Sequence, residues 1–288
     1  MGDDRKDART FFWKRNIIKI VAHCFFNKIM CLLSIFMNLF FVSDDTILGI
    51  YVSISLVKLF LGFSKLENSS ERLYRIINFQ HAVQIFEKGE MYFSHPSKWD
   101  DPYETRLVHS ELDRVYAQCW CKNGVSDAMW RIYSPTHLGV RIGTSAKKLN
   151  KALSSGVKNL GIDIRMEDVK YLSQHDLNRE TKCIQNKLKE NFNLGLATNL
   201  LFMKREAYEH ESECRVIATC QSTSSKMTNN GIKIQIDAKR MIDSILIDPR
   251  APTELADALI YYFKNKIGFT KKCQKSVLYK TPKSYIFE

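Results

Sequence analysis

The sequence predicts an α+β domain with a mixed or antiparallel sheet and flanking helices, preceded by an N-terminal hydrophobic α-helical hairpin. Two nearly continuous apolar stretches lie between residues 20 and 63 of the 288-residue chain. After them, segments with strand and helix periods follow one another without regular alternation, which disfavours a doubly wound parallel sheet. Hydrophobic residues make up 45% and charged residues 26% of the chain. These values are ordinary for a globular protein and exclude a collagen-like or wholly disordered chain.

Residues 1–65 form the first predicted unit. The stretches 20–42 and 47–63 have the lengths of two membrane-spanning helices. Basic residues precede them and the turn between them carries two aspartates and no cation, which predicts both termini in the cytoplasm. The alternative is a pair of soluble helices, since Lys28 interrupts the first stretch. Residues 16–63 are therefore expected to contact the inner membrane or a partner subunit. The partner subunit could be a second copy of this chain, which would make a homo-oligomer.

Charge and cysteine content narrow the class of partner and the compartment. Lys and Arg number 43 against 31 Asp and Glu, a net charge of +12, which favours nucleic acid, acidic lipid or phosphate-bearing small molecules. The eight cysteines include no C-x-x-C pair, which indicates a reducing compartment such as the cytosol. Cys119 and Cys121 have the spacing of a strand, so no metal site is expected there. The motifs of Walker NTPases, Rossmann dehydrogenases, α/β-hydrolases and zincins are absent.

Residues 66–288 form the second predicted unit, whose elements follow from hydrophobic period and from turn residues. The predicted strands are Leu73–Ile77, Met91–Ser94, Val115–Cys121, Leu138–Gly143, Glu213–Thr219, Ile232–Ile236, Ser244–Ile247 and Ser276–Tyr279. The predicted helices are Phe79–Glu87, ended by Gly89, then Ser126–Tyr133, Leu177–Asn191, Leu196–Lys204 and a last helix from Pro252 to Lys266. Two prolines forbid regular structure in the loop between His95 and Glu104.

The densest group of ionisable residues precedes and enters one predicted strand. Alternation on a strand places Glu209, Glu211, Glu213 and Arg215 on one face, where the carboxylates shift one another's pKa. The functional interpretation is a carboxylate pair, Glu211 and Glu213, that orients a ribose hydroxyl and activates a nucleophile. The alternative is a solvated edge strand whose acids are neutralised by Arg215 and Lys204.

The loop that follows the strand Met91–Ser94 carries Trp99, Asp101, Tyr103 and Glu104. Aromatic and acidic residues beside prolines at a strand end are typical of a rigid loop that contacts a ligand. A tight turn, with Asp101 capping the backbone and Trp99 filling the core, would explain the same residues.

Two other segments have both a structural and a functional interpretation. Met129, Trp130 and Tyr133 share one face of a helix, and they either form a core stripe or stack on a base or nicotinamide ring. Arg75 interrupts an apolar strand, so it faces solvent or meets an anion such as a pyrophosphate.

Taken in order, these residues resemble the bacterial family called domain of unknown function 2971. The motifs, which extend over about residues 70–280, are Tyr74-Arg75, Tyr92-Phe93-Ser94-x-Pro96, Trp99-x-Asp101-Pro102-Tyr103-Glu104, Cys119, Met129-Trp130-x-x-Tyr133 with Gly139, Lys204 and Glu211-x-Glu213-x-Arg215. Two positions depart from the family pattern: Asp100 stands where asparagine is commoner and Tyr208 where tryptophan is commoner. The family name itself implies no activity.

The order of Arg75, Ser94 and Glu213 also resembles the Arg, Ser and Glu sequence of ADP-ribosyltransferases. This resemblance implies NAD as the substrate, with Arg75 on its pyrophosphate and Ser94 bracing the site. Glu213 would bind the ribose 2′-hydroxyl and stabilise an oxocarbenium-like transition state, while Glu211 would orient a water or a protein or nucleic-acid acceptor. The candidates for stacking on nicotinamide are Trp99, Tyr103 and Trp130.

Three functions are compatible with the sequence. The first is a bacterial effector, in antiphage defence or as a toxin, whose cytosolic domain acts on NAD or a nucleotide as an ADP-ribosyltransferase or NAD hydrolase. The second is a metal-dependent nuclease or nucleic-acid binder that holds Mg²⁺ with Asp101, Glu104, Glu211 and Glu213. The third is a non-enzymatic effector whose hairpin disrupts the membrane while the domain senses a ligand or a partner.

Overall fold

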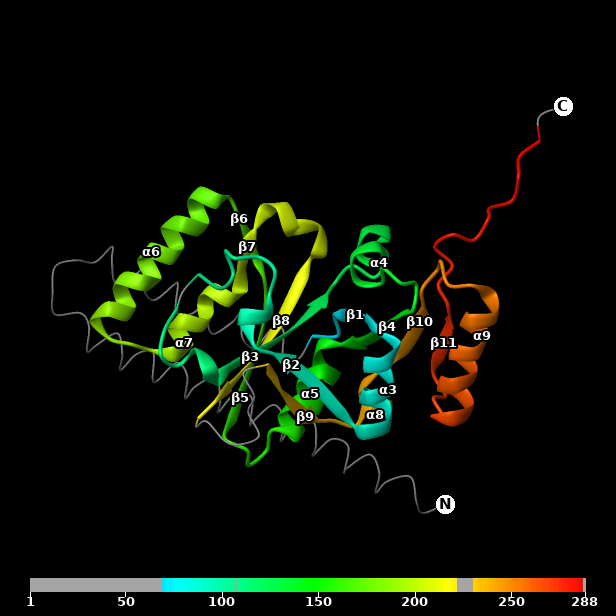
Figure 1. Ribbon diagram of the computed structural model, residues 1–288, viewed down its shortest axis with the longest axis horizontal. Helices are drawn as coiled ribbons and strands as arrows, with labels where there is room; N and C mark the ends of the chain where they lie inside the picture. The colour runs from blue at the N-terminus through cyan, green and yellow to red at the C-terminus, as the bar shows by residue number, and fades with distance from the viewer. Residues whose placement is uncertain (1–68, 107, 222–229, 287–288) are drawn as a thin grey trace, which may run out of the picture. The chain divides into compact units, whose positions relative to one another are not determined.

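The computed structural model describes residues 69–106, 108–221 and 230–286. The predicted hairpin, residues 1–65, lies outside the described residues. No helix within these ranges has the length and apolar character needed to cross a membrane. The described chain has the predicted mixed α+β architecture, with a mixed sheet and flanking helices (Figure 1).

Nine strands form the main sheet. They are β1 (Arg72–Asn78), β2 (Glu90–Ser94), β3 (Val115–Cys121), β4 (Gly139–Ser145), β5 (Ile162–Asp168), β8 (Glu213–Cys220), β9 (Gly231–Gln235), β10 (Ser244–Ile247) and β11 (Lys272–Lys275). The order runs β11-β10-β4-β1-β3-β2-β9, and β8 pairs with both β3 and β5. β10 and β11 are parallel, whereas the other pairs of this sheet are antiparallel. A separate parallel pair joins β6 (Lys170–Leu172) to β7 (Met203–Arg205).

The sheet diverges at β3, which pairs with three strands. β8 follows β3 along its whole length, whereas β1 meets it at Cys121 and β2 meets it at Ala117. Between these points the side chain of Gln118 connects β3 to β2, because its Nε2 donates to the carbonyl of Tyr92 at 2.8 Å. Gln118 Oε1 in turn accepts from Trp120 Nε1 at 2.8 Å. Residues of β1, β2 and β3 around this divergence line the cavity described below.

Helices flank the sheet and enclose its main core. The α-helices are α3 (Phe79–Lys88), α4 (Asp127–Tyr133), α5 (Ala146–Gly156), α6 (Gln174–Glu190), α7 (Leu194–Ala197), α8 (Ala238–Met241) and α9 (Thr253–Tyr261). Apolar side chains of α3, α5 and α9 pack into the main core with alternate residues of β8, such as Val216. Ile217, on the other face of β8, belongs to a smaller cluster with Leu201 and Phe202. The two faces of β8 therefore have different environments, as a period of two requires.

Local capping explains why several predicted helices begin and end where they do. Gly89 ends α3 with φ of 64°, and a Cβ at this position would approach the carbonyl oxygen of Ile236 to 3.0 Å. Ser126 caps α4 because its hydroxyl accepts from the backbone N–H of Met129. Both helices agree with the predicted ones to within about two residues.

Two predicted elements are wrong, and several were missed. The predicted helix Leu196–Lys204 is divided among α7, a 3₁₀ helix over Thr198–Phe202 and β7, because Lys204 pairs with Tyr171 of β6. The predicted strand Ser276–Tyr279 is replaced by the earlier strand β11, whose parallel pairing with β10 buries Cys273. The elements not predicted are α5, α8, β5 and β6.

The segment before β8 departs from the predicted alternation. Glu206–Glu211 forms a 3₁₀ helix, Ser212 adopts a left-handed conformation with φ of 43°, and the strand begins only at Glu213. Glu209 is therefore exposed and does not share the face of Glu213. Glu211 is buried, but it reaches its position from the end of the 3₁₀ helix.

Candidate active site

A cavity of about 440 Å³ lies where β1, β2 and β3 separate. Its wall also includes side chains of α4, β4, β7 and β8, the loop after β2 and the 3₁₀ helix before β8. The predicted site residues that line it are Arg75, Ser94, Trp99, Asp101, Glu104, Tyr133, Lys204, Glu211, Glu213 and Arg215. Residues that are far apart in the sequence thus meet in one cavity.

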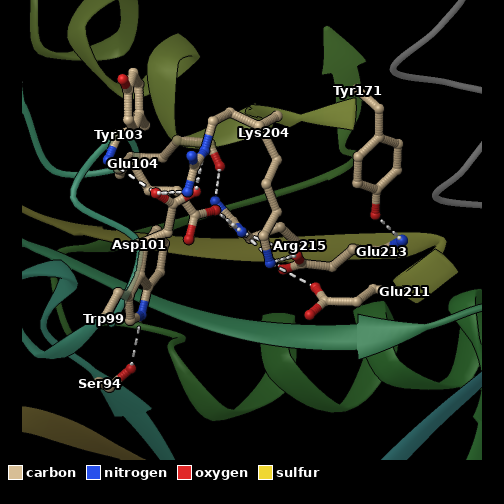
Figure 2. A network of polar contacts seen from close by, with 12 residues as sticks. Ser94, Trp99, Asp101, Tyr103, Glu104, Tyr171, Lys204, Glu211, Glu213 and Arg215 are labelled. Carbon is tan, nitrogen blue, oxygen red and sulfur yellow. Dashed lines mark hydrogen bonds and ion pairs between the residues drawn. The ribbon is translucent and has the colours of Figure 1, made fainter. Parts of the chain in front are cut away.

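Arg215 is the centre of a buried ionic network in this cavity (Figure 2). Its Nε and Nη2 donate to the two carboxylate oxygens of Glu213 at 2.8 and 2.9 Å, which is the paired geometry that guanidinium and carboxylate groups favour. Nη2 also donates to Glu104 Oε1 at 2.6 Å, and Nη1 donates to the carbonyl of Leu201. The Arg215 Cζ lies 4.3 Å from the ring centroid of Trp99. The N–H donors of Arg215 and one face of its guanidinium group are therefore occupied by protein groups. Arg215 holds Glu213, Glu104 and Trp99 in position.

The two carboxylates on Arg215 differ in their pKa. Burial alone would raise the pKa of Glu213, but the charge and hydrogen bonds of Arg215, together with Lys204, outweigh burial and lower the pKa. At Glu104 burial outweighs the attraction of Arg215 and Lys204, so the pKa is raised. Glu213 therefore keeps its negative charge, whereas Glu104 takes up a proton more readily. Acidic groups with separated pKa values can play different roles in one site.

A second ionic group joins Glu211 to the same network. Lys204 Nζ donates to Glu211 Oε2 and lies 3.6 Å from Glu213 Oε2. Tyr133 donates its hydroxyl to Glu211 Oε1 at 3.2 Å. Burial by itself lowers the pKa of Lys204, but the carboxylates of Glu104, Glu213 and Glu211 outweigh it and raise the pKa. Lys204 is therefore a permanent cation that connects β7 to the beginning of β8.

The loop after β2 is fixed by its own side chains. Trp99 Nε1 donates to Ser94 Oγ at 3.3 Å, so the indole ring is held against the end of β2. Asp101 accepts from the backbone N–H of Tyr103 at 3.1 Å and from Arg205 Nη2 at 2.9 Å. Asp101 thus caps the backbone, as the structural interpretation expected, and also lines the cavity.

Two arginines of the cavity wall have no acidic partner among the described residues. Arg75, on β1, makes neither an ion pair nor a side-chain hydrogen bond with that part of the chain, and burial lowers its pKa. Arg141, on β4, has a buried Nε with no hydrogen-bond partner. A partly buried guanidinium without an acceptor is costly, and an anionic ligand would relieve that cost.

Two predicted site residues lie outside the cavity wall. Trp130 is buried in the core, with 2% of its surface exposed, and its carbonyl accepts from Arg250 Nη2 at 2.9 Å. The ring of Tyr103 packs against the guanidinium groups of Arg205 and Arg106, at 4.4 and 5.4 Å from its centroid. Trp99 and Tyr133 are the predicted aromatic residues that line the cavity.

The sequence interpretation missed several lining residues, of which Arg141 and Cys119 are chemically the most notable. Alternation in the predicted strand Leu138–Gly143 places Arg141 on the face opposite Val140 and Ile142, which was the available signal. Cys119 lies opposite Arg215 in the β3–β8 register. Burial and the charge of Glu213 raise the pKa of the Cys119 thiol, which therefore stays protonated.

The predicted magnesium ligands are arranged as ion-pair partners. In the ranges that the structure describes, no group of three or more His, Cys, Asp or Glu side chains is placed to hold a metal ion. The four carboxylates are paired as Asp101 with Arg205, Glu104 with Arg215, Glu213 with Arg215 and Glu211 with Lys204.

Comparisons with known proteins find one family and one group of similar structures. Residues 129–216 match the family described as Protein of unknown function (DUF2971), so the predicted resemblance is confirmed over this part of the chain. A search of curated protein sequences finds no match. Structures of DarT from Thermus sp. 2.9 with ADP-ribosylated ssDNA, with NAD+ and with carba-NAD+ are similar at TM-scores of 0.34, 0.33 and 0.32. They are 10–12% identical to this chain, and the alignments cover 72% of it and 93–94% of theirs.

Proposed function

We propose that the domain binds NAD in this cavity and breaks the bond between nicotinamide and ribose. The observation that carries the proposal is the convergence of Arg75, Ser94 and Glu213 on one cavity. When the bond breaks, its electron pair moves to the nicotinamide nitrogen. The ribose carbon then bonds to an acceptor or a water, which loses a proton. The products are nicotinamide and an ADP-ribosylated acceptor or free ADP-ribose.

The charges of the cavity suit such a dinucleotide. Arg75 has a guanidinium with no acidic partner among the described residues, and a pyrophosphate would supply one. The rings of Trp99 and Tyr133 offer apolar surface for the nicotinamide. Ser94 holds Trp99 in place through its hydroxyl.

Glu213 is the residue best placed to stabilise the transition state. Positive charge develops on the ribose ring as nicotinamide leaves, and a fixed carboxylate stabilises it. The lowered pKa keeps Glu213 ionised, and Arg215 and Lys204 hold it in position. Because each carboxylate oxygen has two acceptor sites, Glu213 can still accept from a ribose hydroxyl. Glu211, held by Lys204, orients the acceptor.

The test is to incubate the purified full-length chain with NAD and measure nicotinamide by mass spectrometry. Glu213→Gln should lose at least about a hundredfold in rate, because it removes the charge that stabilises the transition state. Glu209→Gln is the matched control, since Glu209 is exposed and outside the cavity wall, and it should keep its activity. Circular dichroism would verify folding. Absence of turnover by folded wild-type protein, or equal rates for both variants, would overturn the proposal.

The proposed activity also supports the effector role that the sequence suggests. An enzyme that consumes NAD or modifies an essential acceptor arrests growth when it is produced in a bacterial cell. Induction of the wild-type chain should therefore stop growth, and Glu213→Gln should relieve the arrest at an equal protein level. Arrest that persists in Glu213→Gln would favour the non-enzymatic membrane effector.

A further inference from the structure

Arg141 is a cation of the cavity wall that no described residue neutralises. It lies on β4 opposite Ile76 of β1. Its Nε is buried and has no hydrogen-bond partner. The neighbouring ion that acts on it is Arg72, a like charge, which is itself paired with Asp243 at 2.9 Å. Among the residues that the structure describes, no anion therefore lies next to Arg141.

Tyr74 holds the guanidinium of Arg141 in a fixed position. The Arg141 Cζ lies 4.5 Å from the centroid of the Tyr74 ring. The ring is confined by two glycines, because a Cβ on Gly124 would approach it to 2.8 Å and a Cβ on Gly143 would approach it to 3.2 Å. A guanidinium stacked on a confined ring loses little freedom when it binds an anion.

Arg75 and Arg141 have different neighbours in the cavity. In the register of β1 and β4, Arg75 lies opposite Ile142, whereas Arg141 lies opposite Ile76. The two arginines thus occupy neighbouring register positions, and neighbouring positions along a strand alternate between the two faces of the sheet. The two guanidinium groups therefore define two separate positions for negative charge within one cavity.

We propose that Arg141 forms a second phosphate subsite, separate from the anion position at Arg75. The planar fork of a guanidinium matches two oxygens of a phosphate group, and no described residue accepts a hydrogen bond from the guanidinium of Arg141, which lines the cavity. This inference rests on the proposed function, in which Arg75 takes the pyrophosphate of the dinucleotide. The second phosphate then belongs either to the ribose of the dinucleotide, as in NADP, or to the acceptor.

The experiment compares two arginine variants in the full-length chain. Arg141→Leu removes the proposed subsite, whereas Arg72→Leu removes an arginine on the same sheet face that is already paired and lies outside the cavity wall. Calorimetric titrations with NAD and NADP would be made with each arginine variant and with the wild type, and repeated in the Glu213→Gln background, in which consumption of the ligand is slowed. Inorganic phosphate would be titrated into the wild type and both arginine variants. Arg141→Leu should keep its melting temperature, because the described chain gives Arg141 no ion pair to lose.

Each outcome has a distinct meaning. If the dinucleotide carries the second phosphate, NADP binds at least about tenfold more tightly than NAD and Arg141→Leu removes the difference. If the acceptor carries it, both dinucleotides bind equally, while a short single-stranded oligonucleotide of mixed sequence binds the NAD-loaded chain and loses at least about tenfold in affinity in Arg141→Leu.

Inorganic phosphate separates failure of the subsite from failure of the proposed function. Phosphate binding that Arg141→Leu abolishes, with no binding of either dinucleotide, would support the subsite and contradict the proposed function. The subsite is overturned if Arg141→Leu changes the affinity for none of these compounds, or if Arg72→Leu causes the same loss.

Discussion

The three arginines of the cavity wall differ in what neutralises them. Arg215 contacts two carboxylates, and removing either one would leave a buried charge without its partner. Arg75 and Arg141 have no such partner among the described residues. A charge that the fold itself does not use is a sign of ligand binding, because its burial would otherwise only destabilise the protein. Stability and affinity should therefore respond differently at Arg75 and at Arg215.

Arg75→Leu should abolish NAD binding without lowering the melting temperature. The substitution removes the cation proposed to bind the pyrophosphate, and it also removes a desolvated charge that has no counter-ion in the described chain. Isothermal titration and calorimetric melting would measure both effects. Arg179→Leu, at an exposed position of α6, is the control and should bind NAD like the wild type. A lower melting temperature in Arg75→Leu would mean that Arg75 has a structural role.

Glu213 should contribute stability that depends on pH. Its pKa in the folded protein lies below its usual value of 4.5, because Arg215 and Lys204 outweigh the effect of burial. Ionised Glu213 therefore stabilises the fold fully above pH 4.5, and this contribution disappears as the pH falls through the folded pKa. Chemical unfolding at pH 3–7 should show a difference between wild type and Glu213→Gln that narrows on acidification. A difference in the free energy of unfolding that is constant with pH would contradict a lowered pKa of Glu213 in the folded protein.

The divergence of the sheet at β3 creates room for the cavity. β1 and β2 leave β3 at different residues, and the Gln118 side chain replaces part of the missing backbone pairing. Only 1% of Gln118 is exposed, so its hydrogen bonds have no competition from water. Such an amide has to satisfy both a donor and an acceptor in the protein.

Gln118→Leu should lower the free energy of unfolding by about 1–3 kcal/mol for each group left unpaired. The groups concerned are the Tyr92 carbonyl and the Trp120 indole N–H. Denaturant titration would measure the change, with Gln80→Leu as the control at an exposed position of α3. A change in Gln118→Leu as small as in the control would show that β2 and β3 hold together without this amide.

Most elements of the described domain could be predicted from the sequence, because period and capping are local. The alternation of β8 correctly placed Glu213 and Arg215 on one face. The same alternation does not extend back to Glu211, because the strand begins only at Glu213. Neither the 3₁₀ helix that carries Glu211 nor the left-handed conformation of Ser212 has a strong sequence signal. Arg141 was missed because its place in the cavity depends on the pairing of β4 with β1, which is non-local.

The net charge of the chain and the charges of the two arginines without an acidic partner in the cavity wall have the same sign. A chain with a net charge of +12 attracts anions over long distances. Within the cavity, Arg75 and Arg141 provide specific positions for such anions. Capture of an anionic ligand should therefore weaken as salt is added, because salt screens the long-range attraction.

The apolar stretches in residues 16–63 should hold the full-length chain at the inner membrane. Their lengths suit two spans, and the basic residues before them favour cytoplasmic termini. We expect the chain produced in bacteria to sediment with membranes and to be released by detergent but not by high salt. Replacing Ile35 and Leu56 with lysine puts a charge near the middle of each stretch, at a cost of about 2.5–3.5 kcal/mol per span, and should release the chain. A wild-type chain that stays in solution without detergent and elutes as an oligomer would instead identify a partner subunit as the contact of these residues.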